Sequence, residues 1–259
     1  MNLPAAWIAE IATVALATSR LSGMVVTAPF PGNHVPSQVK IGLVLVLAWV
    51  AMGTMPASHL DLSLDLRLVG LAAGELALGL IVGITFRITF SCAEMMGASF
   101  SQSLGLTQGH VFDPMLESDD GVPGRIATMI AMLLVFSLGA HRIAIAYLLQ
   151  SFHALPVGQA LSVTQATPLL VDYAGAAIAA GVRLGLPVAG VALAVQITLA
   201  LIARASPSLQ IFSVGLALSV VAGLLAILAS MDDVVAGMAV ELGQLGPRLE
   251  QVFEAVAHP

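Results

Sequence analysis

Three charged residues that could take part in chemistry stand inside one long apolar stretch of this 259-residue chain: Glu75, Arg87 and Glu94. A charge at bilayer depth costs about 3 kcal/mol or more unless it is paired or leaves the lipid. Arg87 and Glu94 are seven residues apart, so two helical turns place them on one face. These charges could form a relay or substrate site, as in a transporter. We favour the alternative, in which they pair across an interface between subunits.

Motifs of the common catalytic and metal sites are absent from the sequence. The six histidines show no HExxH spacing, and the single Cys92 excludes an internal disulfide and a CxxC site. Lys40 is the only lysine and lies in no Walker motif, and no GxSxG motif occurs. We therefore expect a protein that is not an enzyme and that binds neither metal nor cofactor. The net charge of −6 excludes a basic surface for nucleic acid.

The composition indicates the class of protein. Hydrophobic residues make up 58% of the chain and charged residues 9%, and the mean hydropathy is +0.98. Soluble domains carry roughly 25% charged residues, so a water-soluble globule of this composition could not cover its surface. Strict alternation of apolar and polar residues is absent, which argues against a barrel. The sequence predicts an all-α, polytopic helical membrane protein.

Prolines and glycines divide the apolar sequence into separate predicted helices. We expect them at about Ala5–Thr27, Ser37–Met55, Leu66–Leu106, Ala127–Phe152, Pro168–Arg204 with an interruption at Pro187, and Ser208–Ser230. The third has 41 residues, about twice the roughly 20 that span a bilayer, so it bends or leaves the membrane. Three GxxxG pairs predict close helix packing: Gly70 with Gly74, Gly79 with Gly83, and Gly181 with Gly185. The first two pairs point to opposite sides of the third helix, which predicts neighbours on both sides.

Two segments differ from the apolar helices. Thr107 to Gly124 is expected to be a long acidic loop, which holds Asp113, Pro114, Glu117, Asp119 and Asp120. Its carboxylates lack EF-hand spacing, so a solvated or partner-facing loop is favoured over a calcium site. Residues 231–259 form a predicted amphipathic tail after a membrane domain of residues 1–230. Its apolar face is broken once at Pro247 and consists of Leu242, Leu245, Leu249, Val252, Phe253 and Val256.

From about Arg20 to Gly215 the chain resembles the FliR/SctT family, the export-gate membrane subunits of bacterial flagellar and type III secretion systems. The order and spacing of several blocks carry the resemblance: Ala28, Pro29, Gly32, Pro36 and Lys40; Glu75, Gly79, Gly83 and Arg87; Gly97, Gln102 and Gly105; Asp113 and Pro114; Phe136, Gly139, His141, Leu148, Ser151, Phe152, Pro156 and Gly158; and Arg204, Pro207, Gln210, Phe212 and Gly215. Gln196 and Gln210 stand where the family usually shows Asn. The resemblance leaves open whether the system is flagellar, virulence-type or divergent.

The resemblance implies a non-enzymatic subunit in the bacterial inner membrane, in a flagellar basal body or the base of a secretion system. Long bent helices would pack with FliP-type and FliQ-type subunits, and with an FlhB-type subunit, around a channel for unfolded protein substrates. Lipid and neighbouring protein would together cover the apolar helices. The loop that corresponds to Thr107 to Gly124 would be a plug that closes the pore. The alternative function is a secondary transporter for a small solute, with Glu75, Arg87 and Arg183 as its site, although no inverted repeat is visible.

Overall fold

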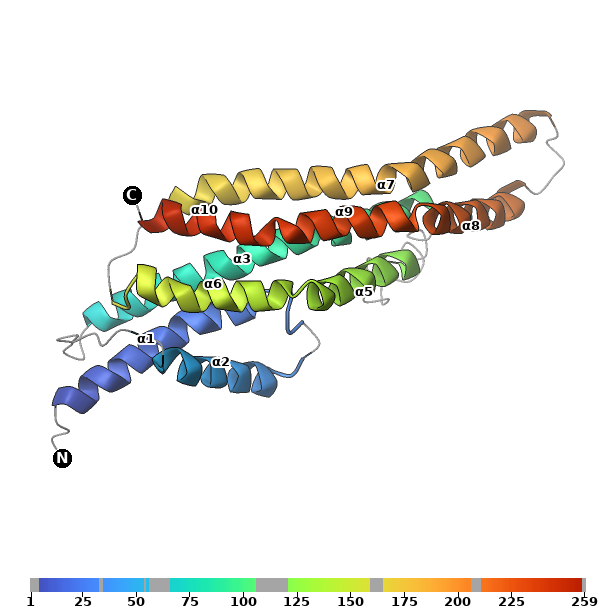
Figure 1. Cartoon of the computed structure of the whole chain (residues 1–259). Helices are drawn as coiled ribbons and strands as arrows, with labels where there is room; N and C mark the ends of the chain where they lie inside the picture. The colour runs from blue at the N-terminus through green and yellow to red at the C-terminus, as the bar shows by residue number, and fades with distance from the viewer. Residues whose placement is uncertain are drawn as a thin grey trace. The chain divides into compact units, whose positions relative to one another are not determined.

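The computed structural model describes residues 5–32, 35–53, 55, 66–105, 121–158, 165–205 and 211–257. Within these ranges the chain is helical and contains no strand, so the predicted all-α class is confirmed. The helices are labelled in Figure 1 and are α1 Ala5–Thr27, α2 Ser37–Met52, α3 Leu66–Ser103, α5 Val122–Ser137, α6 Ala140–Ala154, α7 Ala166–Ala205, α8 Ile211–Ala229, α9 Met231–Gly243 and α10 Leu245–Ala257.

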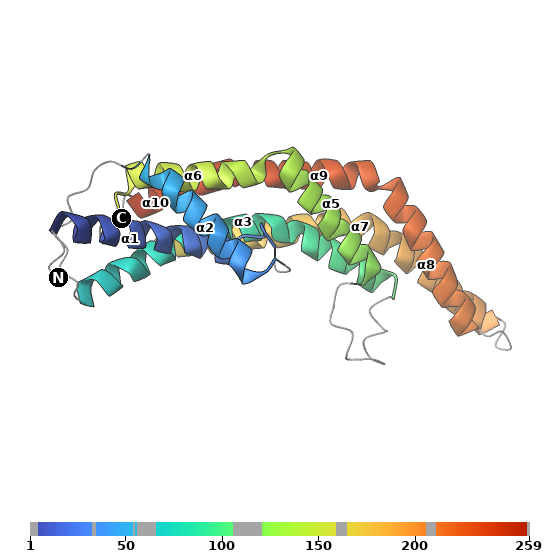
Figure 2. The same ribbon diagram turned by 90° about the horizontal axis from the view of Figure 1, so that it is seen from below.

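The chain divides into two compact units that alternate along the sequence. The first unit comprises Met1–Thr89, Gly139–Ala174 and Gln244–Pro259, and the second comprises Phe90–Leu138 and Gly175–Gly243. In the first unit α2 packs on α1 and α10 packs on α6 (Figures 1 and 2). In the second unit α5 and α8 each contact α9. The last helix therefore belongs with the first helix of the chain, although they are far apart in sequence.

Length and composition make two of the helices candidates to span a membrane. They are the segment Leu68–Ser103 of α3 and the whole of α7, and up to four spans result if each bent pair of apolar helices counts as one. At 1.5 Å per residue the 40 residues of α7 extend about 60 Å, twice the roughly 30 Å of a bilayer core. The chain is therefore a polytopic helical membrane protein whose long helices extend beyond one bilayer span.

Three larger departures from the predicted helix boundaries have local reasons. The helix expected from Ala127 to Phe152 is two helices, because Gly139 adopts the left-handed conformation with φ 69° between them. The interruption expected at Pro187 does not occur, since α7 continues through it. A proline removes one backbone N–H and its ring crowds the preceding turn, but membrane helices tolerate proline because neighbouring groups satisfy the freed carbonyl. The acidic segment also ends earlier than expected, because Val122 to Gly124 form the first turn of α5, where Pro123 is acceptable.

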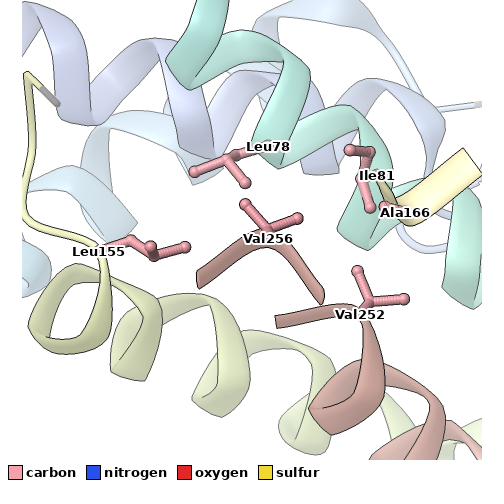
Figure 3. Close-up of a cluster of buried hydrophobic side chains, with 6 residues drawn as sticks. All are labelled: Leu78, Ile81, Leu155, Ala166, Val252 and Val256. Atoms are coloured by element: carbon pink, nitrogen blue, oxygen red, sulfur yellow. The ribbon is translucent and has the colours of Figure 1, made fainter. Parts of the chain in front are cut away.

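Most residues of the apolar face predicted for the C-terminal tail are buried. Leu242, Leu245, Leu249, Val252 and Val256 are buried, and the Phe253 ring stacks on Tyr147 with centroids 6.4 Å apart. The break lies at Gln244 between α9 and α10 and not at Pro247, which sits in the first turn of α10 where a missing N–H costs no hydrogen bond. Figure 3 shows Val256 pointing toward Leu78 of α3 in a cluster that also contains Ile81, Leu155, Ala166 and Val252.

Candidate functional site

The most conspicuous polar feature of the first unit is a buried ion pair between α1 and α3. The Nε atom of Arg20 donates to Oε2 of Glu75 over 2.6 Å, and the two side chains are 0% and 1% exposed. Removing two charges from water is costly, so such a pair persists only where further hydrogen bonds satisfy the remaining groups. The surroundings of Arg20 and Glu75 meet that condition.

Both side chains use their remaining polar atoms on α6 and on the turn after it. Arg20 donates from Nη1 to Oγ of Ser151 and from Nη2 to the carbonyl of Leu155, each over 3.0 Å. The second oxygen of Glu75, Oε1, accepts the backbone N–H of Gly158 over 3.0 Å. The Cζ atom of Arg20 also lies 4.5 Å from the ring centroid of Phe152. We call Arg20, Glu75, Ser151, Phe152 and Gly158 the buried charge cluster.

The cluster is a closed network that joins three helices. In the part of the chain that the structure describes, no buried side-chain nitrogen or oxygen lacks a hydrogen-bond partner. Gly158 has φ 88°, a conformation that favours glycine and that turns its N–H toward Glu75. A network of this kind fixes α1, α3 and the end of α6 in one arrangement. It leaves neither carboxylate oxygen of Glu75 open to a solute.

Small residues bring α1 and α3 close enough for this pair to form. A Cβ atom on Gly79 would overlap the carbonyl oxygen of Arg20, and one on Gly83 would overlap Oγ1 of Thr27. A Cβ atom on Gly23 of α1 would in turn lie 2.7 Å from the backbone nitrogen of Leu80. The two backbones are therefore in direct contact, as small-residue pairs permit in membrane helices. Glu75 precedes Gly79 by one helical turn, so its carboxylate meets Arg20 directly.

Some of the predicted glycine pairs contact a neighbouring helix, and others have no neighbour among the described residues. Gly181 and Gly185 pack on α3, where added Cβ atoms would lie 2.6 Å from the carbonyl oxygen of Cys92 and 2.6 Å from Oγ of Ser99. Added Cβ atoms on Gly70 and Gly74 would have no atom of the described residues within 4 Å. Among the described residues, the expectation of neighbours on both sides of the third helix therefore has no counterpart at Gly70 and Gly74.

The charges predicted to be buried in the third helix have different environments. Within the chain Glu75 is buried, Arg87 is exposed and Glu94 is half-buried. The pairing of these charges across an interface between subunits stays a prediction. Arg87 follows Glu75 by twelve residues, which at 100° per residue turns it about 120° away. Arg20, the partner of Glu75, was not among the predicted site residues. A usable signal was present, because Arg20 is the only basic residue of the first helix.

The other predicted site residues lie elsewhere or outside the described ranges. Arg183 and Arg204 are exposed on α7, Phe212 lies in α8, and Gly215 is buried with an added Cβ 3.2 Å from Leu199. Pro207 and Gln210 fall outside the described residues. The same holds for the predicted plug residues Asp113, Pro114, Glu117, Asp119 and Asp120.

In the second unit, the end of α3 and the start of α5, which flank the acidic segment, are in direct contact. The N–H of Gly124 donates to Oγ of Ser101 over 3.2 Å, and this hydroxyl donates to the carbonyl of Gly97 over 3.1 Å. A Cβ atom on Gly97 would lie 2.8 Å from Cα of Gly124, so the two backbones touch. The last turns of α3 and the first turn of α5 therefore form one anchor for the segment between them.

Comparison with known proteins gives a consistent result over most of the chain. The model of the family described as bacterial export proteins, family 1, matches residues 11–245. The chain is 27% identical over 206 residues to a flagellar biosynthetic protein FliR of Escherichia coli, which covers 79% of this chain and 78% of that protein. It is 24% identical over 233 residues to FliR of Caulobacter vibrioides, covering 87% and 90% of the two chains. FliR of Bacillus subtilis is 26% identical over 223 residues, with 82% and 83% covered.

Proposed function

The chain belongs to the bacterial export proteins, family 1, and from this premise we propose that it is a non-enzymatic membrane subunit of a flagellar protein export gate in the bacterial inner membrane. The observation that carries the proposal is the family match over residues 11–245. The relatives named above are all flagellar biosynthetic proteins, which favours a flagellar over a virulence-type system.

The buried charge cluster supports a structural role for the charges in the helices. A transporter site would present Glu75 to a solute, but both of its oxygens are engaged by Arg20 and Gly158. The cluster instead stabilises the packing of α1, α3 and α6. This arrangement favours a scaffold subunit over a secondary transporter.

The surface of the second unit supports assembly with other membrane subunits. On α7, Leu186, Leu193 and Leu201 are 58%, 58% and 64% exposed, and this apolar surface requires lipid or protein to cover it. Arg183 is exposed on the same helix, where contact with lipid hydrocarbon alone would be costly. We infer that FliP-type, FliQ-type and FlhB-type subunits cover part of this surface and supply carboxylates to its arginines.

The proposal also includes a channel for substrates and a plug that closes it. Unfolded protein substrates would pass through the assembled gate, and residues 107–120 would close it before they arrive. The acidic composition of this segment supports a position in water, and the contact between Gly97 and Gly124 gives it a fixed base in this chain. Opening would then require no change in the helices that hold it.

Expression with and without its expected partners tests the proposal. The full chain is produced alone and together with FliP-type and FliQ-type subunits from the same bacterium, and each preparation is solubilised in mild detergent. We expect the chain to be stable and monodisperse only in the joint preparation, where all three proteins should elute as one complex. A folded, monodisperse monomer that binds a small solute would contradict the export-gate function and support a transporter.

A further inference from the structure

The second unit contains an apolar pocket that the export function leaves without a role. Its volume is about 170 Å³, and its walls include Met96 and Phe100 of α3, Val122 and Ile126 of α5, and Val220 and Leu224 of α8, with the start of α9 completing it. Every lining side chain is a hydrocarbon or a thioether. In another protein an apolar cavity of about 150 Å³ stays free of water and binds benzene. A hydrocarbon group is therefore a better occupant of this pocket than water.

The pocket reaches the surface of the molecule. Val122, Ile126 and Leu224 are 69%, 48% and 44% exposed, so an occupant can enter from outside the chain. The exposed surface of the same two helices is also apolar and continues along Met129, Leu133 and Phe136 of α5 and Val221, Leu225 and Leu228 of α8. Where such a surface faces the hydrocarbon of a bilayer, acyl chains are the most abundant groups of suitable chemistry.

The charges near the pocket identify the kind of lipid. Arg125 is exposed on α5 and follows Val122 by three residues, so the two are neighbours on the helix surface. Its apolar stem can follow the surface of the helix while its guanidinium binds a phosphodiester. On the α9 side, Asp232 and Asp233 are exposed directly after Met231, which lines the pocket. One cation and two carboxylates complement a headgroup that carries both a phosphate and an ammonium group.

We propose that this pocket binds an acyl chain of a zwitterionic phospholipid, whose phosphate contacts Arg125 and whose ammonium group lies toward Asp232 and Asp233. The proposal does not depend on the export function, because it rests on the pocket and its adjacent charges alone. The lipid would fill a void between α3, α5 and α8 and would thereby stabilise their contacts.

Photo-crosslinking tests the proposal. The full chain, together with the subunits that it requires, is reconstituted in vesicles of phosphatidylethanolamine and phosphatidylglycerol. The probe is phosphatidylethanolamine with a diazirine near the end of one acyl chain, and the labelled peptides are identified by mass spectrometry. We expect labelling to concentrate on the pocket segments of α5 and α8. A second preparation carries the same diazirine on phosphatidylglycerol and should label these peptides less.

Matched variants distinguish lipid bound in the pocket from lipid on the surrounding apolar surface. Ile126→Trp and Leu224→Trp fill the pocket from α5 and from α8 at partly exposed positions, and each should reduce the labelling strongly. Met129→Trp adds the same ring at a position outside the pocket that is 66% exposed and should leave the labelling unchanged. Arg125→Gln should reduce it roughly tenfold, as expected for the loss of a charge-assisted hydrogen bond. Arg142→Gln, at an exposed arginine of α6, is the control for charge.

Four results would overturn the proposal or its headgroup assignment. Equal labelling in Ile126→Trp, Leu224→Trp and Met129→Trp would show that lipid does not occupy the pocket. A photoreactive residue at position 126 that crosslinks to another protein chain would make the pocket a protein docking surface. Equal labelling by the two lipid probes, or unchanged labelling in Arg125→Gln, would remove the headgroup assignment. None of these results would affect the complex formation that tests the export function.

Discussion

The Nε atom of Arg20 lies 2.6 Å from Oε2 of Glu75, and neither side chain exposes more than 1% of its surface. The two residues are 55 positions apart in the sequence and come from α1 and α3. Their pairing explains how a membrane helix can carry a carboxylate in its interior. It also explains why residues of two separate sequence blocks, Glu75 from one and Ser151, Phe152 and Gly158 from the other, lie at one place in the fold.

Removing one member of the ion pair is expected to destabilise the chain far more than removing both. Glu75→Met leaves the Arg20 guanidinium buried without a counter-charge and should cost about 3–5 kcal/mol. Arg20→Met should cost a similar amount. The double variant should recover much of the loss but not all, because the N–H of Gly158 and the carbonyl of Leu155 also lose a partner. Thermal unfolding of the four proteins, each in the joint preparation with FliP-type and FliQ-type subunits, measures this cycle.

The control for the ion-pair cycle is Arg142→Met, which removes an exposed arginine and should change the unfolding temperature little. Additive losses in the double variant would contradict a direct energetic coupling between Arg20 and Glu75.

Two glycines of the same helix should respond in opposite ways to alanine. In Gly79→Ala the new methyl group would overlap the carbonyl oxygen of Arg20 and force α1 away, at a cost of about 1–3 kcal/mol. In Gly74→Ala the new methyl group meets no atom of the described residues within 4 Å, and alanine is the better helix former by about 1 kcal/mol. The unfolding temperature should therefore fall in the first variant and stay equal or rise in the second. A similar loss in both would show that Gly74 also packs closely.

The C-terminal helix is expected to be part of the packed unit and not an appendage. Leu249 of α10 is fully buried, so Leu249→Ala should cost about 2–5 kcal/mol through lost contacts and a cavity. Glu250→Ala changes the adjacent exposed residue and should be within about 0.5 kcal/mol of the original protein. Limited proteolysis reports the difference, since only the first variant should release the C-terminal segment readily. Equal protection of both variants would contradict this role.

Arg87 should matter for assembly more than for the fold of the chain. Because its side chain is exposed, contacts that it makes within the chain contribute about 0–1 kcal/mol. If a carboxylate of a partner subunit pairs with it, Arg87→Ala should reduce the yield of the complex while the fold of the chain itself changes little. Co-purification with FliP-type and FliQ-type subunits measures the yield. A normal complex with lost transport of a small solute would instead favour the transporter.

Shortening the acidic segment tests the plug. Deleting residues 117–120 removes Glu117, Asp119 and Asp120 but spares Gly121, whose carbonyl accepts the N–H of Arg125 at the start of α5. The complex should still form, because the anchor between Ser101 and Gly124 remains. Passive leakage of ions through reconstituted complexes should rise. Intact yield without added leakage would refute the plug, and reduced yield would place the segment against a partner.

Local features of the sequence determined the class and many of the boundaries of this protein. A composition of 58% hydrophobic and 9% charged residues excludes a soluble globule, and Pro29, Pro31 and Gly32 end the first helix after Thr27 as predicted. The amphipathic spacing of Leu245, Leu249, Val252 and Val256 identified a buried face. Each of these inferences depends on residues that are close together in the chain, and such short-range preferences act whatever the rest of the fold does.

Only the tertiary structure decided which residues meet. A buried carboxylate requires a cation, but nothing local to Glu75 identifies Arg20, 55 residues away, as that cation. The pairs Gly70 with Gly74 and Gly79 with Gly83 have the same spacing, yet only the second pair touches α1, because contact depends on how the helix is rotated toward its neighbours. The same rotation leaves Arg87 exposed while Glu75 is buried on the same helix. Helical periodicity determines which residues share a face, and the packing of distant segments determines which face is covered.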